Sequence, residues 1–272
     1  MLRLLKSDLK RVLKDKLFLI SCIVCGVYTI LNPLLYKAMF DFMEADTEML
    51  QAMGMMPTAK SMLFQAFLPS GDLGLILPIL IIIAVCKDFS YGTVRNKIIS
   101  GYSRTSVFLS LFLTTSIVMC TLMVAQALIT FGISLMFFEY ADVAFSISEL
   151  GYLLLSLLFE ILTYVTLCAI MSFLCVFMKN AGVSVVMYFV INFVFALIGS
   201  VLSIATVLPG MDESSKKLIE VLINTNIFMS TVIGSGTSYT LEQLLYILAP
   251  NIIFAALFIF LGITVFKKKD LK

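Results

Sequence analysis

The chain has 272 residues, of which 61% are apolar and 13% are charged, and its mean hydropathy is +1.06. Soluble domains are roughly 45–50% apolar and about 25% charged, so this composition excludes an ordinary soluble protein. The net charge is only +2, and the absence of histidine removes the residue that most often binds metals or acts as a general base. The length accommodates about six spans of roughly 20 residues, so we expect an all-α integral membrane protein.

Residues 1–16 have the periodicity of a basic amphipathic helix. Apolar residues recur at helical spacing on one face, and cations cover another. The apolar positions are Leu2, Leu5, Leu9, Val12 and Leu13, and the basic positions are Arg3, Lys6, Lys10, Arg11 and Lys14. Such a helix lies in the membrane interface with its cations near anionic lipid headgroups.

The first predicted span, 17–36, leads into a polar segment, 37–72, that we place outside the cell. Pro33 removes a backbone donor and is expected to kink or end this span. The outside segment holds seven of the sixteen methionines, namely Met39, Met43, Met49, Met53, Met55, Met56 and Met62. Thioethers suit Cu(I), but an adaptable apolar face on short surface helices explains the same residues without a metal. We favour the second interpretation and expect no metal site, because neither cysteine nor histidine joins the cluster.

Five further spans complete a six-span domain over residues 17–266. The second, 73–89, is the shortest and contains Pro78, and a charged loop at 87–105 follows it. The others are 106–138, 150–178, a span that follows the turn at 179–182 and ends near residue 208, and 244–266. Outside segments at 139–149 and 211–243 separate them, and a short helix is expected through residues 218–223. A basic tail, 267–272, ends the chain.

The distribution of charge orients this six-span arrangement. Fifteen of the nineteen Lys and Arg residues fall on one side, and twelve of the seventeen Asp and Glu residues fall on the other. Cations near the ends of spans stay in the cytoplasm, because moving them across the bilayer is costly. The pattern therefore predicts a multi-pass protein of the cell membrane with both termini in the cytoplasm.

The loop between the second and third spans, 87–105, has the features of a docking element. Ser90 or Thr93 can cap a short helix, and Gly101 is placed to end it. Tyr91, Val94 and Ile98 are expected to share one face of that helix. A short cytoplasmic helix with apolar and cationic side chains is suited to contact with a soluble partner, although composition alone also allows an ordinary basic loop.

The spacing of residues in this loop resembles a known family. Asp88, the pair Gly92-Thr93, Arg95, Gly101 and the pair Ser103-Arg104 follow the second of six spans. In this order they are similar to the permease subunits of type-2 ABC transporters, which have an acidic residue, Gly-Thr, an Arg, and a Gly or Pro before Ser-Arg. The six-span layout and the N-terminal helix match as well. Asp88 departs from the pattern, since glutamate is usual there.

The resemblance implies a division of labour. Residues 1–16 would be the elbow helix on the membrane, and the loop would hold a coupling helix that docks on a separate ATP-binding subunit carrying ATP and Mg. The docking residues would be Gly92, Thr93, Val94, Arg95, Ile98, Gly101 and Arg104. A second permease subunit, identical or different, would complete a two-fold assembly in the lipid membrane, and nothing implies nucleic acid as a partner.

The chain itself lacks an ATP-binding motif. A P-loop requires Gly-x-x-x-x-Gly-Lys followed by Ser or Thr, because its backbone donors wrap the phosphates. None of the fourteen glycines is followed by lysine. We therefore expect no cofactor and no enzymatic activity in this polypeptide.

Glu160 is the other candidate functional residue, because it lies ten residues into the fourth span. An ionised carboxylate there costs several kcal/mol unless it has a partner, and the spans contain no Lys or Arg to pair with it. Gln126, Asn192 and Thr163 are polar residues that could satisfy it. Glu160 thus makes either a structural hydrogen bond or a contact with a substrate or proton.

We interpret the chain as the permease subunit of an ATP-driven exporter. A path lined by Phe, Leu, Met and Ile favours a hydrophobic or amphipathic substrate, such as a peptide, a lipid or a drug. The alternative is a secondary transporter or channel that needs no ATPase and uses Glu160 as its coupling acid. A membrane scaffold without a transport cycle is a third interpretation, which leaves the loop at 87–105 without a role.

Overall fold

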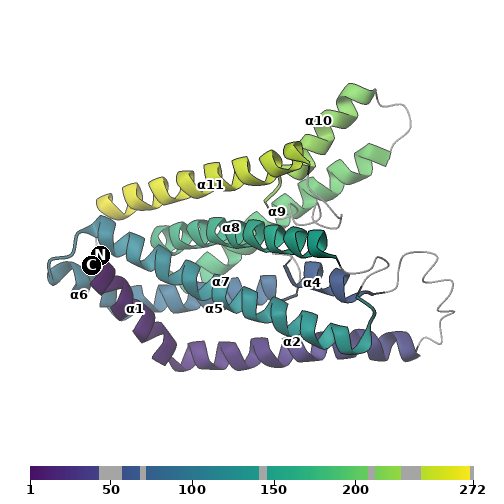
Figure 1. Cartoon of the computed structure of the whole chain (residues 1–272). Helices are drawn as coiled ribbons and strands as arrows, with labels where there is room; N and C mark the ends of the chain where they lie inside the picture. Colours follow the sequence, from purple (N-terminus) through teal and green to yellow (C-terminus); the bar gives the residue numbers. More distant parts are fainter. Residues whose placement is uncertain (43–56, 68–71, 141–145, 208–211, 228–239, 270–272) are drawn as a thin grey trace.

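The computed structural model of the protein describes residues 1–42, 57–67, 72–140, 146–207, 212–227 and 240–269 (Figure 1). These residues form helices and contain no strand. The helices are α1 (Leu2–Lys14), α2 (Lys16–Phe42), α4 (Ala59–Phe67), α5 (Asp72–Ser90), α6 (Thr93–Ile99), α7 (Arg104–Phe137), α8 (Ile147–Met178), α9 (Ala181–Val207), α10 (Glu213–Asn224) and α11 (Leu241–Lys268).

The expected membrane-protein class is confirmed by the length and composition of these helices. Five of them, α2, α7, α8, α9 and α11, are long and apolar enough to cross a membrane. The number rises to six if α5 and α6 are counted as one span bent by 53°. The chain is thus an all-helical, multi-pass membrane protein.

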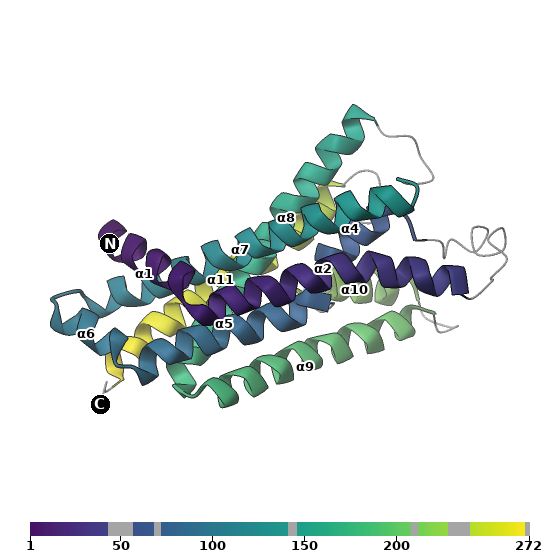
Figure 2. The same cartoon turned by 90° about the horizontal axis from the view of Figure 1, so that it is seen from below.

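Helices α7 and α8 form the centre of the bundle, and α2, α9 and α11 lie at its periphery. In the most apolar stretch of α8, 67% of the residues are buried within the chain, compared with 17% in α9 and 11% in α11. Figures 1 and 2 both show the N-terminus, α6 and the last turns of α11 at one end of the bundle, with α4 and α10 toward the other. The weakly buried outer helices expose apolar side chains to the surrounding membrane.

The helix boundaries differ from the predicted spans at two places. α2 continues through Pro33 to Phe42, so the predicted end of the first span near residue 36 is wrong. Proline inside a membrane helix is tolerated, because nearby polar groups compensate for the missing donor. α11 begins at Leu241, earlier than predicted, because Thr240 and Gln243 form a capping box. The expected helix through residues 218–223 is present as part of α10.

A close approach of α11 to α7 depends on Gly262. An added Cβ at this position would lie 2.2 Å from Cζ of Phe108, a fully buried ring on α7. Phe108 also packs against Phe266, with 6.4 Å between the ring centroids. The absence of a side chain at Gly262 therefore allows α11 to contact α7.

We predict that Gly262→Ala lowers the free energy of unfolding by about 1–3 kcal/mol, because the buried ring cannot move away. Gly132→Ala is the matched control, since a Cβ there meets nothing within 4 Å in the same bundle. Denaturant unfolding of both variants in mild detergent measures the difference. Equal stability of the two variants would contradict the close approach.

Candidate functional site

The short helix α6 is bounded by two glycines in the left-handed backbone conformation. Gly92 precedes it with φ of 67°, and Gly101 follows it with φ of 91°. Glycine adopts positive φ without the clash that a side chain brings. The expected terminator, Gly101, is thus confirmed, but the predicted cap at Ser90 or Thr93 is wrong. Gly92 is the N-cap without a side-chain hydrogen bond, and Ser90 Oγ instead donates to the Cys86 carbonyl at 3.2 Å.

The inner face of α6 packs against the bundle. Val94 is only 2% exposed and belongs to a buried cluster with Leu4, Val107, Phe108, Val176 and Phe266. Ile98 packs on the same cluster. Both residues were predicted to dock on a partner. Val94 is buried and Ile98 is partly buried, and they instead hold α6 to helices α1, α7, α8 and α11.

The outer face of α6 consists of other residues. Tyr91 is 71% exposed and Ile99 is 73% exposed, and Arg95 is exposed between them in the sequence. The expectation that Tyr91 shares a face with Val94 and Ile98 is wrong, because the left-handed turn at Gly92 separates Tyr91 from the helix. Ile99, the last residue of α6, was missed by the sequence prediction.

Arg104 closes the end of α11 and does not face away from the chain. Its Nη1 donates to the carbonyls of Phe266 at 3.3 Å, Lys267 at 2.8 Å and Lys269 at 2.8 Å. Cations at a helix C-terminus satisfy its free carbonyls and its dipole. Arg104 therefore makes a capping contact between α7 and α11, and its docking role stays a prediction.

Lys269 makes an equivalent contact with the end of α8. Its Nζ donates to the carbonyls of Val176, at 2.9 Å, and Phe177. Partial burial, and then the nearby Lys179, lower the pKa of Lys269. Lys269 thus joins the C-terminal ends of α8 and α11, and Arg104 joins the end of α11 to α7.

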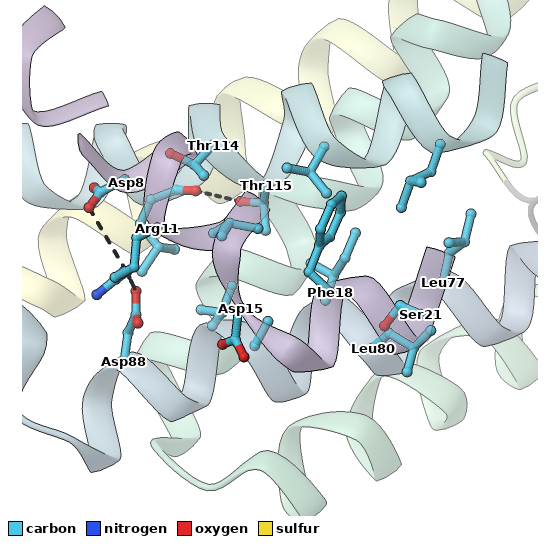
Figure 3. A pocket seen from close by; sticks show the side chains of 17 residues that line it. Asp8, Arg11, Asp15, Phe18, Ser21, Leu77, Leu80, Asp88, Thr114 and Thr115 are labelled. Atoms are coloured by element: carbon cyan, nitrogen blue, oxygen red, sulfur yellow. Dashed lines mark hydrogen bonds and ion pairs between the residues drawn. The ribbon is translucent and has the colours of Figure 1, made fainter. Parts of the chain in front are cut away.

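A network of charged side chains fastens α1 to the helices around α6. Asp8 is only 4% exposed, and its carboxylate lies 2.7 Å from Lys97 Nζ of α6 and accepts a 2.7 Å hydrogen bond from Ser110 of α7. Arg11 pairs with Asp88, and Lys87 pairs with Asp15 at 2.8 Å. Figure 3 shows Asp8, Arg11 and Asp88 meeting where α1 passes α5. Three carboxylates and three cations therefore neutralise one another.

This network reveals a third face on α1 that the sequence prediction missed. Leu4, Asp8 and Arg11 of α1, and Asp15 directly after it, face the bundle, whereas the predicted apolar residues remain partly or fully exposed. The missed signal was the spacing of Asp8, Arg11 and Asp15, which repeats every three to four residues in a helix otherwise rich in cations. Asp88, which departs from the family pattern, has Arg11 as its partner.

The intramembrane polar residues are buried but are not gathered into one hydrogen-bonded group. Glu160 is 4% exposed, and its Oε2 has no hydrogen-bond partner among the described residues. Gln126 lines a separate small cavity between α2, α4 and α7. Thr163 accepts a 3.3 Å hydrogen bond from Asn251, and Asn192 is buried one turn from Tyr188. The predicted satisfaction of Glu160 Oε2 by Gln126, Asn192 or Thr163 is therefore not found.

Much of the methionine-rich segment lies outside the described residues. Of the seven methionines, Met43, Met49, Met53, Met55 and Met56 are in residues 43–56, which the structure does not describe. Met62 of α4 is buried, and Met39 at the end of α2 is exposed. Within the described residues, no group of three or more Cys, Asp or Glu side chains is placed to hold a metal ion.

Residues 18–272 match the family described as "Protein of unknown function (DUF2705)". This match covers nearly the whole chain, and the chain belongs to that family. Among curated proteins, none matches the chain.

We predict that Asp8→Asn lowers the free energy of unfolding by about 3 kcal/mol, because it leaves the buried ammonium of Lys97 without its counter-charge. Lys10→Gln, on the exposed face of the same helix, should change it by less than about 0.5 kcal/mol. Unfolding of the two variants in the same detergent measures both values. A loss of stability no larger in Asp8→Asn than in Lys10→Gln would show that the network does not hold α1.

Proposed function

We propose that this member of the family is the membrane-spanning permease subunit of a type-2 ABC transporter. Helices α2, α5, α7, α8, α9 and α11 are the six spans, α1 is the interfacial elbow helix, and α6 is the coupling helix. The 19 residues of α5 extend about 28 Å at 1.5 Å per residue, close to the roughly 30 Å of the hydrocarbon core. In this arrangement α5 crosses the membrane without α6, which lies beyond the bend between the two helices.

The proposed orientation follows from the charge at the two ends of the bundle. The end that holds α1 and α6 carries most of the cations, including Lys267 and Lys268 at the end of α11. The acids of the opposite end include Glu149 and Glu242, in the first turns of α8 and α11. Cations near the ends of spans are retained in the cytoplasm. In this orientation α6 and both termini lie on the cytoplasmic side of the cell membrane.

The two unequal faces of α6 are the observation that carries this proposal. Val94 and Ile98 fix the helix to the bundle, and Tyr91, Arg95 and Ile99 are left exposed. Exposed large apolar side chains next to a cation, at the aqueous end of a membrane bundle, are typical of a protein contact. The partner is a separate ATP-binding subunit, which binds ATP and Mg and carries out the hydrolysis.

The contacts of α6 also provide a route by which such a partner could move the spans. Lys97 ties α6 to α1, and the α5–α6 turn and Arg104 connect it to α5, α7 and α11. A displacement of α6 on ATP binding is thereby passed to several spans at once. The subunit works with a second, identical or different, permease, and its apolar helices favour a hydrophobic or amphipathic substrate that is exported.

We predict that Ile99→Ser and Arg95→Ala each reduce recovery of a P-loop ATPase with the tagged protein by about tenfold or more, because each removes part of the exposed face. The protein is purified from its native membrane in mild detergent, and the ATPase is identified by mass spectrometry. Lys267→Ala is the matched control, since it removes an exposed cation at the same end. Absence of any P-loop protein from an intact wild-type preparation would overturn the proposal.

A second function, transport coupled to protons or cations without an ATPase, is favoured by Glu160 alone. Its Oε2 has no hydrogen-bond partner among the described residues, and Glu160 lies near the middle of the buried helix α8. In that case Glu160→Gln should abolish transport while leaving assembly and stability normal, because the variant keeps the size but cannot ionise. Transport assays in proteoliposomes with and without ATP separate the two functions, and full activity of the variant would assign Glu160 a structural role.

A further inference from the structure

A cavity that is partly open to the surroundings lies between α1, α2, α5 and α7 (Figure 3). Its lining divides into two parts along its length. Asp8, Arg11, Asp15 and Asp88 form the charged end, which we call the mouth. The apolar part is lined by Val12, Phe18, Leu77, Leu80, Ile81, Ala84, Val85, Leu111, Val118 and Leu122. The cavity is therefore charged at one end and mainly apolar along the rest of its length.

The length of the cavity, from the mouth to its inner end, matches one leaflet of a membrane. On α5 the lining extends from Leu77 to Asp88, and on α7 it extends from Leu111 to Leu122. At 1.5 Å per residue each distance is about 16 Å. Half of the roughly 30 Å hydrocarbon core is about 15 Å. A lipid with its headgroup at the mouth would therefore place an acyl chain along the apolar part of the cavity.

The mouth presents charges of both signs to an incoming headgroup. Arg11, Asp15 and Asp88 are all partly exposed, and Lys87, which pairs with Asp15, adds a second cation at the mouth. A purely anionic headgroup would meet the carboxylates, and a purely cationic one would meet Arg11. A zwitterionic headgroup can place a phosphate on Arg11 and a primary amine on Asp15 or Asp88, because each then meets the opposite charge.

Thr114 provides an independent sign of a ligand just inside the mouth. It is 6% exposed and lines the cavity, and its Oγ1 has no hydrogen-bond partner among the described residues. Its neighbours Thr115 and Ser116 both donate to carbonyls one turn earlier. A buried hydroxyl without a partner costs free energy. The ester carbonyl of a lipid, which lies between headgroup and chain, would accept from it.

We propose that this cavity binds one zwitterionic phospholipid with a primary amine, of the phosphatidylethanolamine type. The headgroup lies at Arg11, Asp15 and Asp88, the ester region lies near Thr114, and one acyl chain lies between α2, α5 and α7. The site is built within a single chain, so the proposal stands whether or not the protein works with an ATPase.

Native mass spectrometry of the delipidated full-length protein tests this proposal. We expect one phosphatidylethanolamine to bind at a concentration about tenfold lower than phosphatidylglycerol with the same chains. Ala84→Phe fills the apolar part and should raise the required concentration about tenfold or more. Ile83→Phe, on the exposed side of α5, is the matched control and should have no effect.

Thr114→Val gives a second test that does not depend on the bulk of Ala84→Phe. It keeps the shape of the side chain and removes the hydroxyl, and we expect a several-fold weaker binding of phosphatidylethanolamine. Equal binding of the two lipids would overturn the proposal. Binding that neither Ala84→Phe nor Thr114→Val weakens, in variants that elute as the wild type does, would overturn it as well, since it would indicate lipid on the outer surface only.

Discussion

The ion pair between Asp8 and Lys97 is the interaction on which the proposed coupling end depends. A helix of seven residues such as α6 does not form stably by itself, because nucleation costs more than its few hydrogen bonds return. Val94 provides packing for α6, and Lys97 links it to a carboxylate that is itself held by Ser110. Because Asp8 belongs to α1, the helix proposed to lie on the membrane also becomes the support of the helix proposed to meet the ATPase.

Contacts at the ends of helices extend this support across the bundle. Arg104 at the start of α7 binds the last carbonyls of α11, and Lys269 just beyond α11 binds the last carbonyls of α8. The opposite end is joined separately, by the ion pair between Lys60 of α4 and Glu149 of α8. Each end is therefore tied within itself, and the long central helices α7 and α8 connect the two. Such an arrangement allows a force applied at α6 to reach the far end through the spans.

Hydropathy and charge were sufficient to predict the helices and their class. Runs of apolar residues in this chain are long, and in a membrane the helix is the structure that satisfies its own backbone. The helix through Pro33 shows the limit, because the surroundings decide whether a proline ends a membrane helix. The short helix before Gly101 was also predictable, since that glycine marks its end, although its start at Gly92 was not predicted.

The arrangement of individual side chains was less predictable. Periodicity places Val94 and Ile98 on one face of α6 but does not say whether that face meets the bundle or a partner. The left-handed turn at Gly92, which moves Tyr91 off that face, depends on how α5 meets α6. Similarly, the positions of Glu160 and Gln126 within apolar spans suggested that the two could meet but could not show that Gln126 lines a small cavity between α2, α4 and α7. Contacts between distant segments, such as Asp8 with Lys97, require the folded chain.

The most direct test of the proposed role is to place a photoreactive phenylalanine analogue at position 99 and irradiate cells that make the full-length protein. We expect it to crosslink to a soluble P-loop ATPase, whereas the same group at the inward position 94 should react only within the chain. Adducts at position 99 confined to lipid, or to proteins without a P-loop, would contradict the assignment of α6 as a coupling helix.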